Sequence, residues 1–513
     1  MDDSFSTIST TDDYENNECV VYDDSSLLKR VHNFLCFDAL NLQSTSLRNT
    51  TLAELSSSIS YISHYGLDVC FTEEYHLSVS ELEPYRRVGD PELDDLLSKL
   101  SVGPFDDIIL SAAAAATSEE PPKCETSKQL AQFYRHYELV PSWVDFDQIQ
   151  RGIDVILAYL PAAGLVLYGS GLVKGFGIPE IVEVLRSTGH FSPRKALERL
   201  TDTAGLTAAC FAPIDDDEQV VSAASLRPGG KGWLAALRVR VLHAKVRQRL
   251  LQLKRKGNDG HHTQRWDIKK NGVPINQEDM AYTLLAFSVD VLVGIEIIAG
   301  KPLPTNEQLD YLALWRYIGW LLGVDTLESE DVSSNSNRAA HESLPPIDPC
   351  RSMLHAYTSS ESIALHVLHP EPNSCEIVTN LLSVTGLFAF SSEACRKLIG
   401  EPLADSLGLP KCSCQQGWRV DGVQGFAVNF LLKVVVYTFL MCFRVYTLLT
   451  MQYPWFRAKT VAWHGEFKQK YLQRFEKSTA RRKGAAFKKD NPTSASMSRR
   501  SLCPFSMVMP PQM

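Results

Sequence analysis

The stretch "RVRVLHAKVRQRL", residues 238–250, reads as a helix that is apolar over most of its circumference. At about 100° per residue, Ala236, Val239, His243, Val246 and Leu250 fall on one line of this helix. A second apolar face is formed by Leu234, Leu237, Val241 and Ala244. Helices that are apolar on most sides lie inside a protein, so this stretch predicts a buried central helix.

His243 lies in the middle of the apolar line, and two interpretations are open. It can be a core histidine whose ring nitrogens are satisfied by neighbouring groups. Alternatively, it can be an axial ligand of a metal or haem iron, with Arg240 and Arg247 pairing anionic groups such as propionates. The helix alone does not decide between them.

The composition describes an ordinary globular protein with an unusual N-terminus. In a chain of 513 residues, 44% are apolar and 22% are charged, which is enough to build a sizeable core. The first 24 residues carry eight acids and no base, a composition that cannot bury enough apolar surface to order itself. Residues 1–75 are therefore predicted to be largely disordered.

The C-terminal part combines an apolar stretch with a basic one. Residues 425–449 are the most apolar of this part, but they contain Lys433 and Arg444. A lysine at the centre of a bilayer costs about 2.5–3.5 kcal/mol, which favours a helix lying on a membrane or packed on a partner over a spanning one. Thirteen Lys or Arg between Arg457 and Arg500 suit an anionic membrane surface, and no nucleic-acid partner is expected.

The rest of the chain predicts helices and few strands. Between residues 129 and 325 no series of alternating strands occurs, and residues 272–300 read as one long helix capped by Asn276 and closed by Gly300. Residues 155–173 are free of charge, so they suit either a membrane span or a tightly packed pair of core helices. We expect a linker at 331–349, a helical extension at 350–470 and a basic disordered tail at 471–513.

The usual enzymatic signatures are missing, since there is no P-loop, nucleophile elbow or HExxH motif. Cys412 and Cys414 are the only closely spaced cysteines, which makes a structural zinc site improbable. What remains is a set of polar residues on apolar helices: Glu180, Glu183, Arg199, Thr203 and His243. They can form a polar pocket in a dry core, or a structural ion pair with a core threonine.

Six motifs, taken in order, resemble a known family: "YRRVGDPELDDLL" (85–97), "LVKGFGIPEIVEVLRSTGHF" (172–191), "RLTDT" (199–203), "LRVRVLHAKVR" (237–247), "GVPINQEDMAYTLLAFS" (272–288) and "LWRYIGWLLGV" (314–324). The order and spacing are similar to the catalytic domain of rubber oxygenase (latex-clearing protein), shared with the endoplasmic-reticulum-bound oxygenase of mycophenolic acid biosynthesis. The resemblance covers about residues 80–330, and more loosely the chain up to about residue 470. It implies an all-α fold with a globin-like core, flanking helices and a b-type haem.

The resemblance also implies roles for individual residues. His243 would be the proximal iron ligand, and Arg199 and Thr203 would lie on the distal side or support the haem pocket. The catalytic base of the family would fall on Glu183, with Glu180 close enough to remain an alternative. One departure is Asp202, which stands where rubber oxygenase can place a lysine that caps the iron.

The function implied is that of a haem b-dependent oxygenase, which uses O₂ on a carbon–carbon double bond of an isoprenoid or related lipid. The alternative is a non-catalytic protein of the same fold, either haem-binding or membrane-associated and structural. We expect association with a membrane, that of the endoplasmic reticulum, through residues 425–449 and the basic tail. A cytoplasmic location is the alternative.

Overall fold

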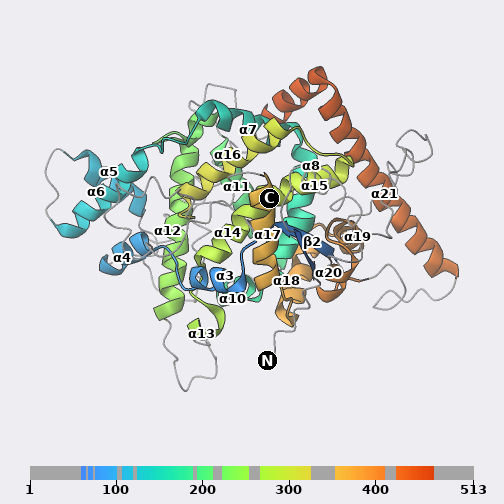
Figure 1. Ribbon diagram of the computed structural model, residues 1–513, viewed down its shortest axis with the longest axis horizontal. Coiled ribbons are helices and arrows are strands. Elements are labelled where there is room, and N and C mark those ends of the chain that lie inside the picture. The colour runs from blue at the N-terminus through green and yellow to red at the C-terminus, as the bar shows by residue number, and fades with distance from the viewer. Residues whose placement is uncertain are drawn as a thin grey trace, which may run out of the picture.

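The computed structural model describes residues 59–64, 67–72, 76–100, 107–118, 124–188, 193–211, 222–252, 266–324, 353–410 and 423–466. Within these residues the chain is helical apart from one hairpin, so the predicted all-α class is confirmed (Figure 1). The hairpin pairs β1 (Ile59–His64) with β2 (Leu67–Thr72) in antiparallel register. It was not expected, because it lies in the stretch predicted to be largely disordered. The predicted linker and basic tail lie outside the described residues.

The N-terminal part of the described chain forms four helices. They are α3 (Val79–Arg86), α4 (Pro91–Lys99), α5 (Ile108–Thr117) and α6 (Glu125–Glu138). Asp90 caps α4 by accepting a hydrogen bond from the Leu93 N–H, and Pro91 is the first helical residue. Both α4 and α5 contact α12 (Lys231–Gln252), which holds the motif with His243.

The charge-free stretch 155–173 forms bent core helices. It begins in α7 (Phe146–Ala158) and continues through α8 (Leu160–Val166), the π-helical turn η1 (Leu167–Gly171) and α9 (Leu172–Gly175). The chain bends by 80° between α7 and the following segment. α7 packs closely on α16 (Thr305–Leu321), and α8 on α15 (Val289–Ala299), so the packed-helix interpretation describes this stretch.

The central helix α12 is buried as its sequence predicts. Ala236, Val239, Val246 and Leu250 are all buried. The indole of Trp233 is fully buried, and its Nε1 donates to the Tyr137 carbonyl oxygen at 3.2 Å. The helix follows α10 (Pro179–Ser187), α11 (Pro193–Cys210) and the 3₁₀ turn η2 (Ala223–Leu226), and it packs against α11 and α16.

The prediction of one continuous helix over residues 272–300 is wrong, because the structure has two helices there. After the short α13 (Ile268–Asn271), the chain forms α14 (Gln277–Phe287) and then α15, with a break at Ser288. The hydroxyl of Ser288 donates to the Leu284 carbonyl oxygen at 2.9 Å. Hydrogen bonds of this kind from serine compete with the backbone hydrogen bonds that would continue the helix. The predicted ends are confirmed: Asn276 makes a capping box, and Gly300 has a left-handed φ of 73°.

The helices after residue 350 complete the same hydrophobic core. They are α17 (Met353–Val367), α18 (Pro372–Ser383), α19 (Phe388–Ile399), α20 (Glu401–Ser406) and α21 (Val423–Gln452). Ile363, Val378 and Leu407 belong to the same buried cluster as Trp233 and Leu292. The long α21 runs along one edge of the molecule, opposite α5 and α6 (Figure 1).

Among the residues that the structure describes, two stretches are long and apolar enough to cross a membrane by length and composition. Residues 277–299, which form α14 and α15, are 89% buried inside the protein and therefore serve as core. Residues 430–452 of α21 are only 28% buried. The apolar surface that the fold leaves uncovered is thus concentrated on α21.

Candidate active site

His243 opens onto an internal cavity of about 260 Å³. On α12 the cavity wall is formed by His243 together with Val239 and Val246, which lie on the line predicted from the helical period. Segments far apart in the sequence supply the other walls, among them α9, α10, α11, α14 and α18. The predicted central helix therefore presents its histidine to a space large enough for a ligand, rather than to packed core.

The cavity wall is almost entirely apolar. Representative lining residues are Phe176, Leu185, Leu206, Met280, Phe287 and Trp315. Among the described residues, the ionisable groups of the lining are His243, Asp279 and Tyr282. A cavity of this kind binds a largely apolar ligand, whose orientation is set by the few polar groups.

The wall formed by η1 and α9 leaves additional room for a ligand. Gly175 lines the cavity, and no atom lies within 4 Å of the position where a Cβ would stand. Gly171, also in the lining, has a different role, because a Cβ there would come within 3.0 Å of the Ala286 carbonyl oxygen. The π-helical turn that ends at Gly171 is of a type often found at functional sites.

The two residues predicted from the "RLTDT" motif lie one turn apart on α11. Thr203 lines the same cavity as His243. Arg199 lies one turn before it in α11, but its side chain is outside the described part of the structure, as is that of Asp202. The structure thus brings Thr203 and His243 together at one cavity.

Glu183 and Glu180 point in different directions on α10. The Glu183 carboxylate accepts hydrogen bonds from Arg186 at 2.7 and 2.8 Å and from Ser187, on the outer side of the helix. It does not belong to the described cavity lining. Glu180 is buried and paired with Arg86 at 2.5 Å. This placement gives Glu183 no contact with a ligand in the cavity.

Arg240 and Arg247 have carboxylate partners within the protein. The guanidinium of Arg240 donates to both oxygens of Asp90, at 2.5 and 2.9 Å, and that of Arg247 donates to Asp94 at 2.7 Å. Both arginines are buried, and neither lines the described cavity. The structure therefore places them between α12 and α4, where they join the two helices, and we do not propose them as partners of a cofactor.

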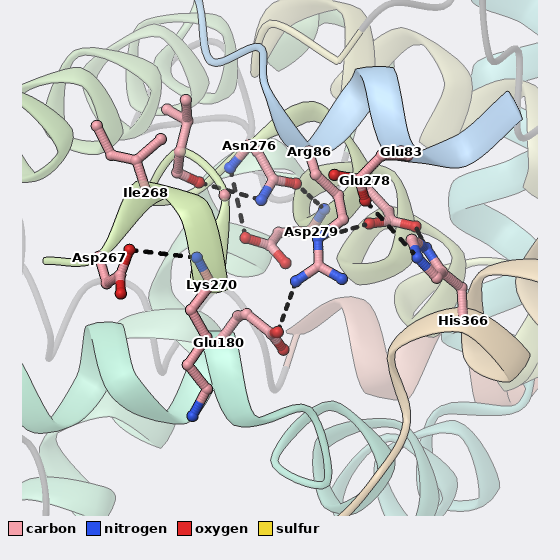
Figure 2. A network of polar contacts seen from close by, with 12 residues as sticks. Glu83, Arg86, Glu180, Asp267, Ile268, Lys270, Asn276, Glu278, Asp279 and His366 are labelled. Carbon is pink, nitrogen blue, oxygen red and sulfur yellow. Dashed lines mark hydrogen bonds and ion pairs between the residues drawn. The ribbon is translucent and has the colours of Figure 1, made fainter. Parts of the chain in front are cut away.

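A buried polar network that the sequence reasoning missed lies behind the cavity wall (Figure 2). Arg86 from α3 reaches Glu180 on α10 at 2.5 Å and Glu278 on α14 at 3.7 Å. The Nδ1 of His366 on α17 lies 2.5 Å from a carboxylate oxygen of Glu278. The next residue on α14, Asp279, lines the cavity.

The signal for this network was present in the motifs quoted above. "YRRVGDPELDDLL" contains Arg86, and "GVPINQEDMAYTLLAFS" contains Glu278 and Asp279. Charged residues inside an apolar helix are expensive to bury unless they are paired, so the "QED" run could have been taken as a buried site. Its partners on α3, α10 and α17 could not be identified, because they lie far apart in the sequence.

The surroundings of Asp279 favour its protonated form. Burial raises the pKa of the Asp279 carboxyl well above its ordinary value, and the neighbouring carboxylates of Glu278 and Glu180 raise it further. Arg86 and the Asn276 N–H act in the opposite direction but do not outweigh them. Burial likewise raises the pKa of Glu278, against the opposing effect of His366.

The fold and the cavity define a protein of the all-α class with a largely apolar ligand site. Residues 155–429 match the family described as ER-bound oxygenase mpaB/B'/Rubber oxygenase, catalytic domain, and the chain belongs to this family. It is accordingly an oxidoreductase of the oxygenase class. The matched region begins in α7 and ends in α21, so it contains every element that lines the cavity.

A solved structure of latex clearing protein in the closed state is similar to this chain. The two are 16% identical, with a TM-score of 0.46, and the similarity covers 71% of this chain and 91% of the other. No curated protein sequence matches the chain.

Proposed function

We propose that the protein is a haem b-dependent oxygenase that uses O₂ to oxidise a carbon–carbon double bond of an isoprenoid or related lipid. The observation that supports this most directly is the position of His243, which a buried helix presents to an apolar cavity. The family supports oxygenase activity, and the apolar wall favours a hydrocarbon chain over a polar substrate.

The donor groups of the cavity fit a haem. The described residues contain no group of three or more His, Cys, Asp and Glu that could hold a metal ion. A haem needs only one protein ligand on its proximal side, which His243 would supply. The open space at Gly175 and the apolar wall suit a flat, apolar macrocycle. When bound, the haem iron supplies the activation of O₂.

The residues of the chain have the remaining tasks. The apolar walls hold the hydrocarbon part of the substrate and exclude water from it. Thr203 supplies a hydroxyl at the cavity, and we propose Arg199 as a second polar group from the same helix. Glu183 lies on the outer side of α10, where its carboxylate binds Arg186. We therefore do not propose it as the base that takes a proton from the substrate.

Replacing His243 by alanine is expected to abolish haem binding. The absorption spectrum of the purified protein, recorded before and after dithionite, should show the Soret band of a b-type haem in the wild type and none in His243→Ala. His369→Ala is the matched control, because this histidine is exposed and does not line the cavity. A wild type without a Soret band after incubation with haem, or a variant that keeps the band, contradicts the proposal.

We also propose that the protein associates with a membrane surface through α21. One face of this helix is packed: Arg444 is fully buried and donates to the Ile298 and Ile297 carbonyl oxygens at the end of α15. Elsewhere the helix exposes apolar side chains, among them Phe430 and Leu431, at 61 and 62%. A helix with one packed face and exposed apolar side chains suits a position in the membrane interface. The guanidinium of Arg444 does not oppose this, because it binds carbonyl oxygens inside the protein.

The double variant Phe430→Ser/Leu431→Ser is expected to weaken vesicle binding about tenfold or more. Each substitution removes apolar surface that would otherwise be buried in lipid. The measurement is co-sedimentation of the full chain with vesicles of phosphatidylcholine and phosphatidylserine. Leu110→Ser is the matched control, since Leu110 is 60% exposed on α5 at the opposite edge of the molecule. Equal loss of binding in the control, or no loss in the double variant, rules out α21 as the contact.

A further inference from the structure

We propose that Asp279 forms a hydrogen-bonding subsite in the cavity that recognises a carbonyl or hydroxyl oxygen on an otherwise apolar substrate. This inference rests on the proposed function in one respect, that the cavity is where the substrate binds. It adds to the substrate class, because it predicts a lipid that carries an oxygen function rather than a pure hydrocarbon.

The first support is the position of the carboxyl group. Asp279 lines the cavity, and its side chain is more than nine-tenths buried, with 8% of the residue exposed. Its Oδ2 accepts a hydrogen bond from the Asn276 N–H at 3.4 Å, as part of the capping box of α14. Its Oδ1 has no hydrogen-bond partner among the described residues. An oxygen in this situation is available to a ligand.

The second support is the charge around the carboxyl group. Four ionisable groups lie behind it: Glu278 on the same helix, Arg86 on α3, Glu180 on α10 and His366 on α17 (Figure 2). The two basic groups are already engaged, Arg86 by Glu180 at 2.5 Å and His366 by Glu278 at 2.5 Å. Neither forms an ion pair with Asp279 in the described structure. Two other carboxylates, those of Glu278 and Glu180, are nearby. A proton on Asp279 removes the repulsion between its own charge and theirs.

A protonated carboxyl group has a defined binding preference. Its O–H donates a hydrogen bond, which a carbonyl or hydroxyl oxygen accepts and a hydrocarbon cannot. A buried donor that a ligand leaves without a partner costs about 1–3 kcal/mol, so the cavity discriminates against ligands that lack the oxygen. The apolar walls around Asp279 bind the hydrocarbon part of the ligand equally well whether or not the ligand carries the oxygen.

The test compares two ligands that differ in one oxygen: geranylacetone, and the hydrocarbon in which its carbonyl group is replaced by a methylene group. The dissociation constants are measured by calorimetry with the full-length protein as purified, without turnover. We expect the wild type to prefer the ketone by about tenfold, the size of one net hydrogen bond. Asp279→Leu should remove the preference, and Asp279→Asn, which keeps a donor and nearly the same shape, should retain it.

A pH series separates the role of Asp279 from that of the other groups near the cavity, which are Glu278, Glu180, Arg86, His366 and, also in the cavity lining, His243. As the pH rises and Asp279 loses its proton, the wild type should lose its preference for the ketone. Asp279→Asn should keep its preference at every pH. This comparison also covers the case in which Asp279→Leu does not fold, because Asn preserves the capping box.

The outcomes are distinct from those of the haem experiment. Equal binding of the two ligands by the wild type, a preference that persists in Asp279→Leu, or a preference that declines with pH in Asp279→Asn overturns the subsite. A ketone preference in a protein that binds no haem would support the subsite while the haem proposal fails. A haem-containing protein without the preference would show the reverse.

Discussion

Arg240→Met is expected to lower the free energy of unfolding by about 3–5 kcal/mol, because it leaves a buried carboxylate without its partner. Arg240 is 4% exposed, and so is Asp90, whose two oxygens it binds. The guanidinium also lies 4.6 Å from the centre of the Tyr137 ring, a cation–π contact that the methionine would lose. The measurement is equilibrium unfolding in urea at neutral pH.

The matched control for this prediction is Arg238→Met on the same helix. Arg238 pairs with Asp107 at 3.0 Å, but about a third of each side chain is exposed, 34 and 32%. Ion pairs that solvent can reach contribute about 0–1 kcal/mol, so this variant should be close to the wild type. The double variant Asp90→Asn/Arg240→Met should recover part of the loss, since it contains no buried unpaired charge and keeps a cap for α4. Equal losses in the two single variants would contradict the importance of burial.

The loss in Arg240→Met should also depend on pH. Burial alone would raise the pKa of Asp90, but Arg240 outweighs it, so the pKa in the folded protein is lowered. A carboxyl group of this kind contributes stability above its unfolded pKa of about 3.9, and the contribution is lost as the pH falls through the lower folded value. The difference between wild type and variant should therefore be largest near neutral pH and shrink below about pH 4.

Gly152→Ala is expected to destabilise the protein by about 3 kcal/mol or more, at the upper end of what overpacking costs. Gly152 lies where α7 packs on α16, and a Cβ there would stand 2.3 Å from the Asp310 carbonyl oxygen and 2.9 Å from the Leu314 Cβ. Because the nearest atom belongs to the main chain, the two helices would have to move apart. Thermal unfolding followed by circular dichroism measures the effect.

Gly164→Ala is the matched control for this substitution. Gly164 is also a helical glycine, in α8, but no atom lies within 4 Å of the position of its Cβ. Alanine favours the helix by about 1 kcal/mol over glycine, so this variant should be as stable as the wild type or more so. A Gly152→Ala protein that unfolds at the same temperature as Gly164→Ala would show that α7 and α16 are not in such close contact.

Much of the fold was predictable because helices follow local rules. The apolar line through Val239, His243 and Val246 predicted both the burial of α12 and the side of it that carries the histidine. Caps such as Asn276 and Gly300 marked helix ends correctly, since they depend on a few adjacent residues. The break at Ser288 was missed, because a serine inside an apolar stretch has no distinctive pattern.

The candidate site was predictable only in part. His243 and Thr203 meet at the cavity as their motifs suggest. Glu183 was assigned by its spacing from Arg199, but its side chain bonds to Arg186 on the outer side of α10. Glu183 lies on α10, whereas Arg199, from which it was counted, lies on α11. Because a loop separates the two helices, the spacing in sequence does not fix which side of α10 faces the cavity.

The sequence by itself determined the helical class, the burial of α12 and the placement of His243 on an apolar face, since each follows from the period of the helix within one segment. Only the tertiary structure decided which charges meet. It paired Arg240 with Asp90 and Arg86 with Glu180, and left Asp279 at the cavity without an ion-pair partner among the described residues. The physical reason is that a buried charge is stabilised by whichever groups the packing brings within a few ångströms, and these come from helices far apart in the chain.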